Sequence, residues 1–454
     1  MTRTERDTLG EVAVDAERLW GAQTQRSLNN FPIGTETMPT EIIWAFGVLK
    51  AAAARANLAL GAGIDERQCS LICRVCDEIR EGQLDAEFPL KVWQTGSGTQ
   101  TNMNVNEVIV HRARQLDAET ALHPNDHVNR SQSSNDTFPT AMRIAAAAAV
   151  CRDLLPAAER LAETLARLEA QWPDLIKCGR THLQDAVPIR FAQEVSGWRG
   201  MLETDCRMIR AILPELLTLP LGGTAVGTGL GAPKEFGALA ASYVAESTGL
   251  SFHAVENRFH ALTSLDQFAA LHGTLKGLAS DLMKIANDIR WLASGPRCGL
   301  GELTLPANEP GSSIMPGKVN PTQCEALTMI AVQVMGNDAA VGFAASQGNF
   351  ELNVFLPVTA YNLLQSVRLL SDGMNSFRIR CAAGLRPVPE RMASYLSRSL
   401  MNVTALSGTI GYEKAARVAG YAHETGLTLP EAAETLGFLE AEEAEKLLDP
   451  AGLV

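Results

Sequence analysis

A short stretch, Gly311–Pro321, carries the densest set of side chains that could do chemistry. It holds two glycines and two prolines, which exclude a helix interior or a central strand and predict a loop. Ser312, Lys318 and Asn320 supply a hydroxyl, an ammonium and an amide. Glycine lets backbone N–H groups approach a ligand closely. Held between helical stretches, a polar loop of this kind suits an anionic ligand, but its composition alone fits an ordinary connector between helices better.

The order of residues in this loop resembles the signature of the fumarase/aspartase superfamily. Its continuation, Thr322–Ala326, looks like that of the class II fumarases in particular. The resemblance extends over nearly the whole chain and includes five further motifs, which are Trp20–Ser27, Trp93–Gln100, Ser131–Asp136, Gly179–Ala186 and Gly222–Gly229. Five motifs in the right order are highly specific.

The resemblance implies reversible elimination across a carbon–carbon bond beside a carboxylate. For a class II fumarase this is the hydration of fumarate to (S)-malate in the tricarboxylic acid cycle. Water adds or leaves in the anti sense, through a carbanion of the aci-carboxylate type. Such a reaction needs a base for the carbon-bound proton, fixed donors or positive charge for the developing dianion, and an acid for the leaving group.

The resemblance also assigns roles to residues. Ser312 is the base, and its alkoxide needs stabilisation by the loop's N–H groups and Lys318. His182 organises the water, with Glu325 orienting the ring and raising its basicity. The residues expected to bind substrate are Ser97, Gly98, Thr99, Ser133, Ser134, Asn135, Thr181, Ser313, Lys318, Val319 and Asn320. Considered alone, the serines at 133 and 134 also suit a helix cap.

A second dicarboxylate site is suggested by His123, Pro124, Asn125 and Asp126, which resemble a site seen in fumarases. The chain departs from that pattern, because the preceding segment Asp117–Leu122 is short and Thr120 stands where the pattern has an arginine. The Gly222–Gly229 stretch lacks the strand and helix context of a dinucleotide fingerprint and is expected to be a packing or substrate-adjacent loop.

Three other lyase activities and one non-catalytic role compete with hydration. Aspartate ammonia-lyases share the loop but typically have alanine at the position of Gly317 and glutamine at that of His182. Argininosuccinate and adenylosuccinate lyases match the motifs less well. A different class is a catalytically silent structural protein on the same scaffold, as some lens crystallins are. The presence of the whole catalytic set argues against it, namely Ser312, His182, Lys318 and Glu325.

The composition excludes several classes of function. The 454 residues carry a net charge of −12 and a pI near 5.3, without the basic face that nucleic-acid binding requires. The N-terminus lacks the apolar core of a signal peptide. No apolar run is expected to reach the roughly 18 residues of a membrane span. The sequence therefore predicts a soluble, cytoplasmic protein with no membrane partner.

The cysteines do not predict a metal or cofactor site. Nine are scattered along the chain, as expected of reduced thiols. Cys69, Cys73 and Cys76 have the spacing of an iron–sulfur motif, but the stretch Glu66–Glu81 holds no glycine or proline and reads as a helix. The three are therefore expected to be buried small apolar residues. No zinc pattern is present, so neither metal nor cofactor is predicted.

The elements that must position these residues are helices. Helices are expected first at 41–60, 66–80 and 104–116. Longer helices are expected at 137–171, with a kink at Pro156, at 190–217, 262–292 and 321–345, and at 353–381, with a break near Pro357. Short helices are expected at 427–436 and 440–448. The sequence predicts an all-α fold of three domains, with a mixed, mainly helical domain at 1–135, a long-helix bundle at 136–387 and a small helical domain at 388–454.

One helix predicts assembly. From Phe268 to Leu292 apolar residues alternate spacings of three and four, which is a heptad seam. Five long apolar helices exceed what one chain can cover, so other subunits are expected to bury this seam. The resemblance implies a homotetramer with a central twenty-helix bundle, whose active sites draw motifs from three chains.

Overall fold

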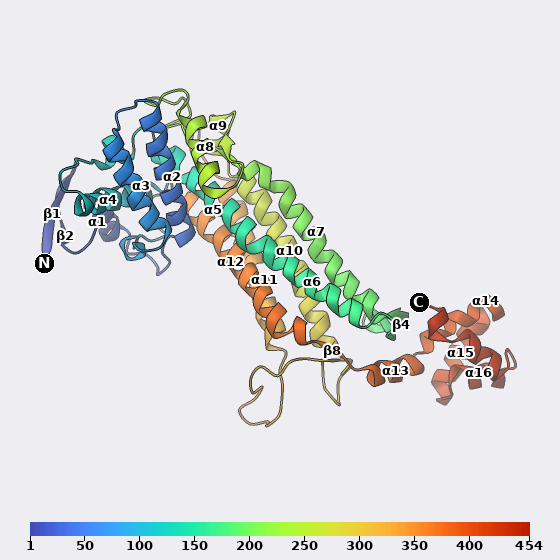
Figure 1. Cartoon of the computed structure of the whole chain (residues 1–454). Coiled ribbons are helices and arrows are strands. Elements are labelled where there is room, and N and C mark those ends of the chain that lie inside the picture. Colours follow the sequence, from blue (N-terminus) through green and yellow to red (C-terminus); the bar gives the residue numbers. More distant parts are fainter. The chain divides into compact units, whose positions relative to one another are not determined.

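The computed structural model describes all 454 residues, and helices dominate it (Figure 1). The strands form four separate two-stranded sheets, none of which can organise a core. The all-α class expected from the sequence is confirmed, because every long element is a helix.

The helices are α1 (Ala22–Asn30), α2 (Thr40–Ala59), α3 (Glu66–Arg80), α4 (Thr99–Leu116), α5 (Ser134–Ala149), α6 (Leu155–Gln171), α7 (Phe191–Leu216), α8 (Phe236–Thr248), α9 (Arg258–Thr263), α10 (Asp266–Leu292), α11 (Thr322–Ala345), α12 (Leu356–Arg380), α13 (Pro389–Arg398), α14 (Ser407–Ile410), α15 (Tyr412–Thr425), α16 (Leu429–Thr435) and α17 (Ala441–Leu447). The strands are β1 (Thr2–Asp7), β2 (Gly10–Asp15), β3 (Ile176–Thr181), β4 (Gln184–Arg190), β5 (Thr218–Leu219), β6 (His253–Ala254), β7 (Leu303–Thr304) and β8 (Arg386–Pro387).

The chain divides into two compact units, each made of three separate segments. The first unit comprises Met1–Pro156, Asp205–Ala279 and Ile330–Ser371. The second comprises Ala157–Thr204, Ser280–Met329 and Asp372–Val454. The boundaries at residues 135 and 387 follow chain order instead, and the division into three domains stays a prediction.

Helix α2 lies at the centre of the first unit, where it packs against α3, α5 and α8 (Figure 1). It is buried on nearly all sides, with Ile42, Phe46 and Leu49 fully enclosed. A helix that is apolar around its whole circumference needs such cover. One charged residue, Lys50, is enclosed with them.

The helix predicted over 137–171 is interrupted just before its proline. Helix α5 ends at Ala149, a π-helical turn covers Val150–Leu154, and α6 begins at Leu155. Pro156 has no N–H, and its ring crowds the carbonyl four residues earlier. A widened turn relieves that conflict, so the irregularity that the sequence places at Pro156 falls within the preceding turn.

The apolar seam of α10 is already buried in the single chain. Its eight seam residues, from Phe268 to Leu292, are at most 5 % exposed. The expectation that other subunits cover this seam is therefore wrong, because the chain covers it with its own residues. A heptad pattern shows that a helix face must be buried but does not show which chain buries it.

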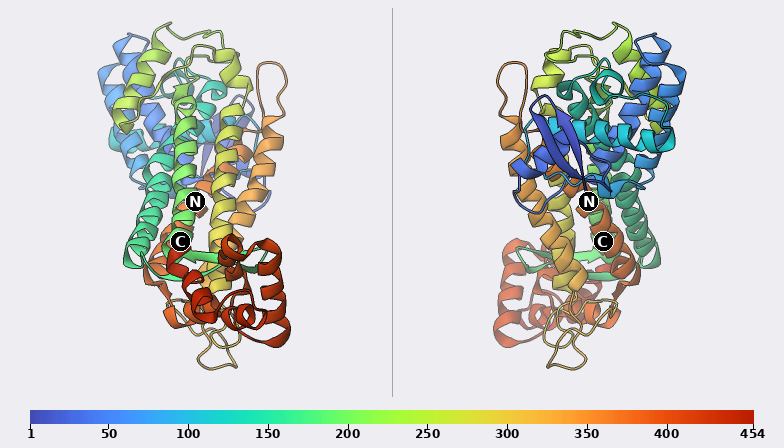
Figure 2. Two further views of the ribbon diagram at one scale, coloured as in Figure 1. Left: turned by 90° about the vertical axis from the view of Figure 1, so that its right-hand side faces the viewer. Right: turned by 90° about the vertical axis from the view of Figure 1, so that its left-hand side faces the viewer.

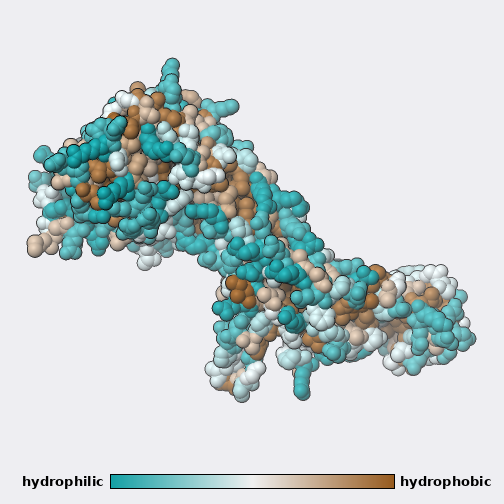
Figure 3. Space-filling view, in the orientation of Figure 1, coloured by the Kyte–Doolittle hydropathy of each residue, from teal (hydrophilic) through white to brown (hydrophobic).

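Exposed apolar residues remain on α11 instead. Val332 is 62 % and Phe343 is 75 % exposed, and Gly336 and Ala339 are also exposed between them. On the face shown in Figure 3, apolar residues reach the surface in several places along the long helices. Such a row on one helix marks a surface that another molecule can cover.

Two helices reach the length and apolarity of a membrane span, contrary to the expectation that no such run exists. They are α2, whose most apolar window is 72 % buried, and α11, whose window is 28 % buried. The burial of α2 identifies it as a core helix of the first unit.

The C-terminal residues form a small core of their own within the second unit. Helices α15, α16 and α17 gather around it (Figure 2). Its buried members are Val403, Leu406, Ala415, Val418, Ala422, Leu429, Ala432, Ala433 and Ala444. A core of this size is covered by short helices alone.

Candidate active site

The first unit carries the turn that precedes α4, where Ser97, Gly98 and Thr99 lie. Gly98 has a φ of 73°, and a β-carbon there would lie 2.1 Å from the Phe138 ring. Only glycine therefore fits this position. The Ser97 and Thr99 hydroxyls lie 2.8 Å apart and hydrogen-bond each other. Whichever donates, the other keeps its proton free for an external acceptor such as a carboxylate.

The same unit places Ser133, Ser134 and Asn135 at the start of α5. The Ser133 hydroxyl accepts from the Asn135 N–H at 3.2 Å, and the Asp136 carboxylate accepts from the Ser133 N–H at 2.8 Å. This reciprocal pair is a capping box. The helix-cap interpretation is correct, and it is compatible with anion binding because a helix N-terminus presents N–H groups.

Asp136 joins this turn to the glycine-rich stretch Gly222–Gly229. Its Oδ2 atom accepts from the N–H groups of Gly222 and Thr224, both at 2.9 Å. Burial raises the pKa of Asp136 to about 6, against the opposing effect of these backbone donors. Asn135 Nδ2 donates to the Ala225 carbonyl at 2.8 Å. The glycine-rich stretch therefore packs against the start of α5 and holds it in place.

The second unit carries Thr181 and His182 at the end of a hairpin. Strands β3 and β4 pair antiparallel, and Thr181 opposes Gln184, so His182 and Leu183 form a two-residue turn. Both have positive φ, 56° and 60°. A two-residue hairpin turn favours this conformation, but glycine and asparagine adopt it far more readily than leucine or histidine. The backbone thus holds His182 exposed in a strained position.

A buried cluster of charges holds this hairpin. Arg180, next to Thr181, donates to both carboxylate oxygens of Glu302 at 2.8 and 3.1 Å. Lys177 Nζ lies 3.0 Å from Glu194 and 3.5 Å from Glu302. Burial raises the pKa of Glu194, although Lys177 opposes that rise. A bidentate arginine–carboxylate pair fixes geometry strongly, so the cluster orients the strand that carries His182.

The loop at Gly311–Pro321 points backbone donors at one hydroxyl. Ser312 Oγ accepts from the N–H groups of Ile314 at 3.3 Å and Met315 at 3.1 Å. The loop closes through the Gly311 N–H, which donates to the Lys318 carbonyl at 2.9 Å. Two donors aimed at one oxygen stabilise negative charge on it, as in an oxyanion hole.

The other predicted residues of this loop face outward. Ser313, Lys318 and Val319 are exposed, and the Lys318 ammonium makes no hydrogen bond or ion pair within the chain. Asn320 donates one amide hydrogen to the Gly311 carbonyl, which leaves the second amide hydrogen for another acceptor. The loop therefore offers an uncompensated cation and neutral donors beside Ser312.

Glu325 lies in the first turn of α11, and its side chain is exposed. No hydrogen bond or ion pair within the chain joins it to His182. Both residues belong to the second unit, so the predicted His182–Glu325 pair is not formed inside one copy of this unit. The Ser312 loop, by contrast, belongs to the second unit, whereas Ser97, Ser133 and Ser134 belong to the first.

The predicted second dicarboxylate site opens onto a cavity of about 460 Å³ in the first unit. His123, Pro124 and Asn125 line it, whereas Asp126 does not. Asp126 instead lies on a π-helical turn, where its Oδ2 is 3.0 Å from His123 Nδ1. Thr120 does not replace the missing arginine, because its hydroxyl donates to Asp117 at 2.8 Å.

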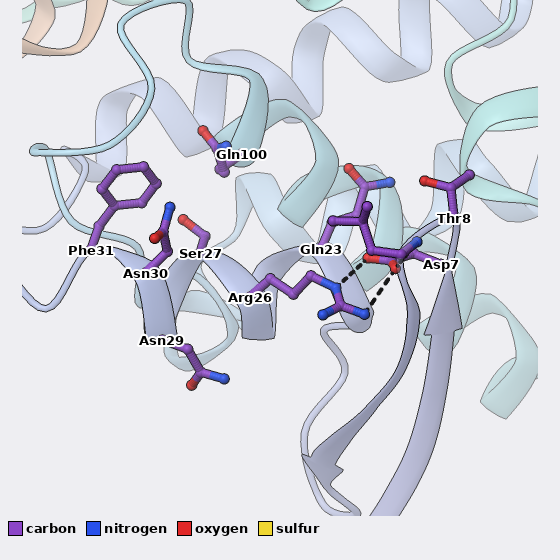
Figure 4. A pocket seen from close by; sticks show the side chains of 10 residues that line it. Asp7, Thr8, Gln23, Arg26, Ser27, Asn29, Asn30, Phe31 and Gln100 are labelled. Carbon is purple, nitrogen blue, oxygen red and sulfur yellow. Dashed lines mark hydrogen bonds and ion pairs between the residues drawn. The ribbon is translucent and has the colours of Figure 1, made fainter.

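Another cavity, of about 650 Å³, lies beside the residue that follows Thr99. Gln100, Gln23 and Ser27 are among its lining residues (Figure 4). Its cation, Arg26, donates to both oxygens of Asp7, at 2.8 and 3.0 Å (Figure 4). The neighbouring carboxylate compensates the arginine, so this cavity offers neutral amides more than charge.

Sequence reasoning missed two buried carboxylates, Glu302 and Glu107, that hold segments of the recognised motifs in place. Arg180 lies inside a recognised motif, but its partner Glu302 is far along the chain and belongs to no motif. Glu107 is similar, because its carboxylate accepts from the N–H groups of Gly21 and Gln23 at the start of α1. Buried charges within apolar helices, such as Glu107 in α4, are the signal that could have revealed them.

Comparisons with known proteins cover nearly all of this chain. A family model described as a lyase matches residues 10–336, and one described as the fumarase C C-terminus matches residues 403–454. A class II fumarate hydratase of Bacillus subtilis (strain 168) is 57 % identical over 100 % of this chain and 98 % of its own. One from Staphylococcus aureus (strain MRSA252) is 56 % identical over 100 % and 99 %.

Solved structures of the same family are also similar to this chain. A recombinant class II fumarase from Schistosoma mansoni superposes with a TM-score of 0.97 at 42 % identity, covering 99 % of this chain and 98 % of its own. A fumarate lyase:delta crystallin from Brucella melitensis bound to cobalt gives a TM-score of 0.94 at 38 % identity, over 100 % and 99 %. Full-length identity at this level establishes the family, and the chain belongs to the class II fumarate hydratases, which are lyases.

Proposed function

We propose that the protein catalyses the reversible hydration of fumarate to (S)-malate by anti addition and elimination of water. Its family membership supports this activity. The observation that carries the mechanism is Ser312 Oγ, which accepts two backbone N–H groups beside the uncompensated Lys318. That arrangement suits a serine alkoxide acting as a base on an anionic substrate.

The elimination direction starts at C3 of malate. The Ser312 alkoxide takes the proton from C3, and the electron pair moves into the adjacent carboxylate to give an aci-carboxylate dianion. Lys318 and Asn320 bind that carboxylate, where the second negative charge develops. The backbone N–H groups of Ile314 and Met315 stabilise the alkoxide before the proton is taken.

The leaving hydroxyl departs from C2 as the C2–O bond breaks. His182 donates a proton to it, so water leaves and the double bond of fumarate forms. Glu325 orients the histidine and raises its basicity. Because the two do not meet within one chain, the pair is assigned to residues of different copies.

The other carboxylate of the substrate is bound by neutral donors. Ser133, Ser134 and Asn135 supply them at the α5 N-terminus, with Ser97, Gly98 and Thr99 from the turn before α4. Thr181 from the β3–β4 hairpin, and Ser313 and Val319 from the loop, complete the pocket. Helix N-termini and hydroxyls suit a carboxylate without requiring a second lysine.

The assembly proposed is a homotetramer. Val332, Gly336, Ala339 and Phe343 lie on α11 with alternating spacings of four and three, which is a second heptad seam. Unlike the α10 seam, this one is exposed in the single chain. A second copy of the chain is the partner that covers it, and subunits then share active sites.

The cavity at His123, Pro124 and Asn125 is proposed as a second dicarboxylate site. Its three carboxylates are already engaged: Glu5 contacts His111 and Arg3, Asp7 pairs with Arg26, and Glu107 caps α1. The lining also includes Arg6 and Arg114, which are exposed and make no ion pair in the chain. These two arginines would supply positive charge in place of the one missing at Thr120.

We further propose a pathway and a compartment for the protein, the tricarboxylic acid cycle and the cytoplasm, with no metal or cofactor required. Fumarate and malate are its partners besides its own copies, and neither nucleic acid nor a membrane is involved.

One assay separates this function from its rivals. Malate and aspartate are supplied in turn, and fumarate is followed by the ultraviolet absorbance of its conjugated double bond. Turnover of malate with negligible turnover of aspartate is expected, because His182 stands where ammonia-lyases typically have glutamine. Comparable rates on both substrates would favour the ammonia-lyase, and no turnover of either would favour a silent structural protein.

A further inference from the structure

Lys50 is a charged residue enclosed in the core of the first unit, and the chemistry above gives it no role. It lies on α2 with 0 % of its surface exposed, and its Nζ is 6.0 Å from the centre of the Phe46 ring. Proteins almost never bury a lysine completely unless it is paired or used. The contacts of this ammonium therefore need an explanation.

The ammonium is held by neutral amides and not by a carboxylate. Its Nζ donates to Gln132 Oε1 at 2.9 Å and to Asn129 Oδ1 at 3.1 Å. No carboxylate lies within ion-pair distance of it. Both amides belong to the segment that leads directly into Ser133–Asn135.

A defined relay of donors and acceptors continues from Lys50 to Ser134. An ammonium can only donate, so Asn129 must turn its amide oxygen toward Lys50. That oxygen also accepts from Asn102 Nδ2 at 3.1 Å, which fixes the Asn102 amide with its nitrogen on this side. The other hydrogen of Asn102 Nδ2 goes to Ser134 Oγ at 3.1 Å. With its oxygen already accepting, Ser134 keeps its own O–H as a donor.

We propose that Lys50 is a positioning residue that anchors one end of this relay, so that Ser134 presents a hydroxyl donor to the substrate carboxylate while the buried charge adds positive potential beneath it. This inference rests on the proposed function of Ser133–Asn135. It explains how a subsite lined only by neutral groups can bind an anion. It also explains why α2 keeps a lysine among apolar residues.

The same arrangement predicts a dependence on pH. Burial lowers the pKa of Lys50 to about 7, although Asp136 on α5 opposes the shift. Below about 7 the ammonium is present; above it the amine is neutral, so the positive potential beneath Ser134 is lost. Asn129 keeps its orientation, because its Nδ2 donates to the Gln132 carbonyl at 3.3 Å. Cys76 on α3 also faces Lys50, but burial raises the pKa of its thiol, which stays neutral in this range. Asp136, with a pKa near 6, titrates on the acidic side.

The test compares Lys50→Met, which removes charge and donors, with Lys50→Gln, which removes the charge but keeps a donor. The matched control is Arg55→Met, which removes a cation from the same helix where its side chain is 37 % exposed. KM and kcat for malate are measured from pH 6 to 9 on the assembled wild type and variants. Circular dichroism and sedimentation establish that each is folded and assembled.

For Lys50→Met we expect KM to rise roughly tenfold to a hundredfold, the loss typical of a hydrogen bond to a charged group, with a smaller change in kcat. Wild-type KM should rise as the pH passes through about 7. Both Lys50 variants should lack that rise, and Lys50→Gln should show the smaller loss at pH 6. Arg55→Met should keep wild-type KM and its pH dependence.

A folded Lys50→Met with wild-type KM and an unchanged pH profile would overturn the inference. If that variant does not fold, the same result for Lys50→Gln would overturn it. A merely structural role would lower the amount of active enzyme without changing KM or its pH dependence. A wild type that turns over no malate would contradict the proposed function, and this outcome is distinct from either result for Lys50.

Discussion

Ser312 receives two backbone hydrogen bonds while it is still a neutral hydroxyl. The donors are therefore in place before charge forms, and little reorganisation accompanies the loss of its proton. Such a group contributes mainly in the transition state, because the substrate does not need it in order to bind.

Ser312→Ala should accordingly abolish turnover and leave substrate affinity largely intact. The measurements are steady-state rates on malate and equilibrium binding of a dicarboxylate. Ser242→Ala, an exposed serine on α8, is the control for removing one hydroxyl. Near wild-type turnover in Ser312→Ala would show that another group is the base.

His182 should matter most for the leaving group. A departing hydroxide needs a proton, whereas ammonia leaves from a group that is already cationic. His182→Gln should lose hydratase activity by ~10²–10⁴-fold, the usual scale of acid–base assistance. It should not gain aspartate turnover, because that also requires recognition of the ammonium. A variant that retains most of its malate turnover would refute the assignment of the acid.

For single residues, the sequence predicts which side chains are candidates for chemistry, but it does not predict the contacts that position them. The motifs contain Ser312, His182 and Lys318 because short, dense polar stretches are visible locally. Glu302 is absent from every motif, and its contact with Arg180 depends on how distant segments fold together. His182 and Glu325 show the same restriction on prediction from sequence. Their contact is expected from the motifs, but it does not form within one chain.

Among the elements, the β3–β4 hairpin holds two non-glycine residues at positive φ. Leu183 contributes to this strain, is 67 % exposed and has no proposed catalytic role. Leu183→Gly should relieve about 1–2 kcal/mol, the cost of a left-handed residue with a β-carbon. Its entropy cost in the unfolded chain, about 0.5–1 kcal/mol, subtracts from that gain.

We therefore expect Leu183→Gly to raise the midpoint of thermal unfolding slightly, measured by calorimetry. Leu183→Ala keeps a β-carbon and provides the comparison, because it removes the apolar side chain without releasing the backbone. A glycine variant less stable than the alanine variant would mean that the turn is not strained.

Helix α11 carries the element-scale prediction on assembly. Val332→Asp with Phe343→Asp places two charges on the exposed seam, where burial against another copy would leave them unpaired. The double variant should dissociate in sedimentation and lose activity. Ser242→Asp, an exposed charge on α8, should remain assembled. A fully active, tetrameric double variant would exclude this face as the interface.

Helix boundaries are the part of the fold that the sequence predicts best. The run at 66–80 matches α3 at both ends, because Asp65 and Gln68 form a capping box that fixes its start. The hairpins were not predicted, since β1 and β2 are largely polar and pair only with each other. The prediction that other subunits bury the α10 seam is wrong, because the periodicity of apolar residues does not show which chain packs against them.

For the whole molecule, the distribution of metal-ligating side chains leads to a prediction about metals. No group of three or more metal-ligating side chains lies together, and all nine cysteines are free thiols. Exhaustive chelation under anaerobic conditions should therefore leave malate turnover unchanged. Activity that is lost on chelation and returns with iron or cobalt would show that a metal takes part.

The organisation of the whole chain was harder to predict than its parts. Each compact unit combines three segments that are far apart in sequence. Boundaries drawn from composition follow chain order and cannot represent such interleaving. Helices α7, α10, α11 and α12 each contribute residues to both units, so no linker marks the division.

The absence of a His182–Glu325 contact within one chain also has a genetic consequence. If each active site takes these residues from different copies, a cell with two damaged alleles can still make working sites. One allele would encode Glu325→Gln and the other His182→Gln. Mixed tetramers would contain some sites where both residues are intact, so two inactive gene products would partly restore each other. Selection would then act on the assembled population and not on each chain by itself.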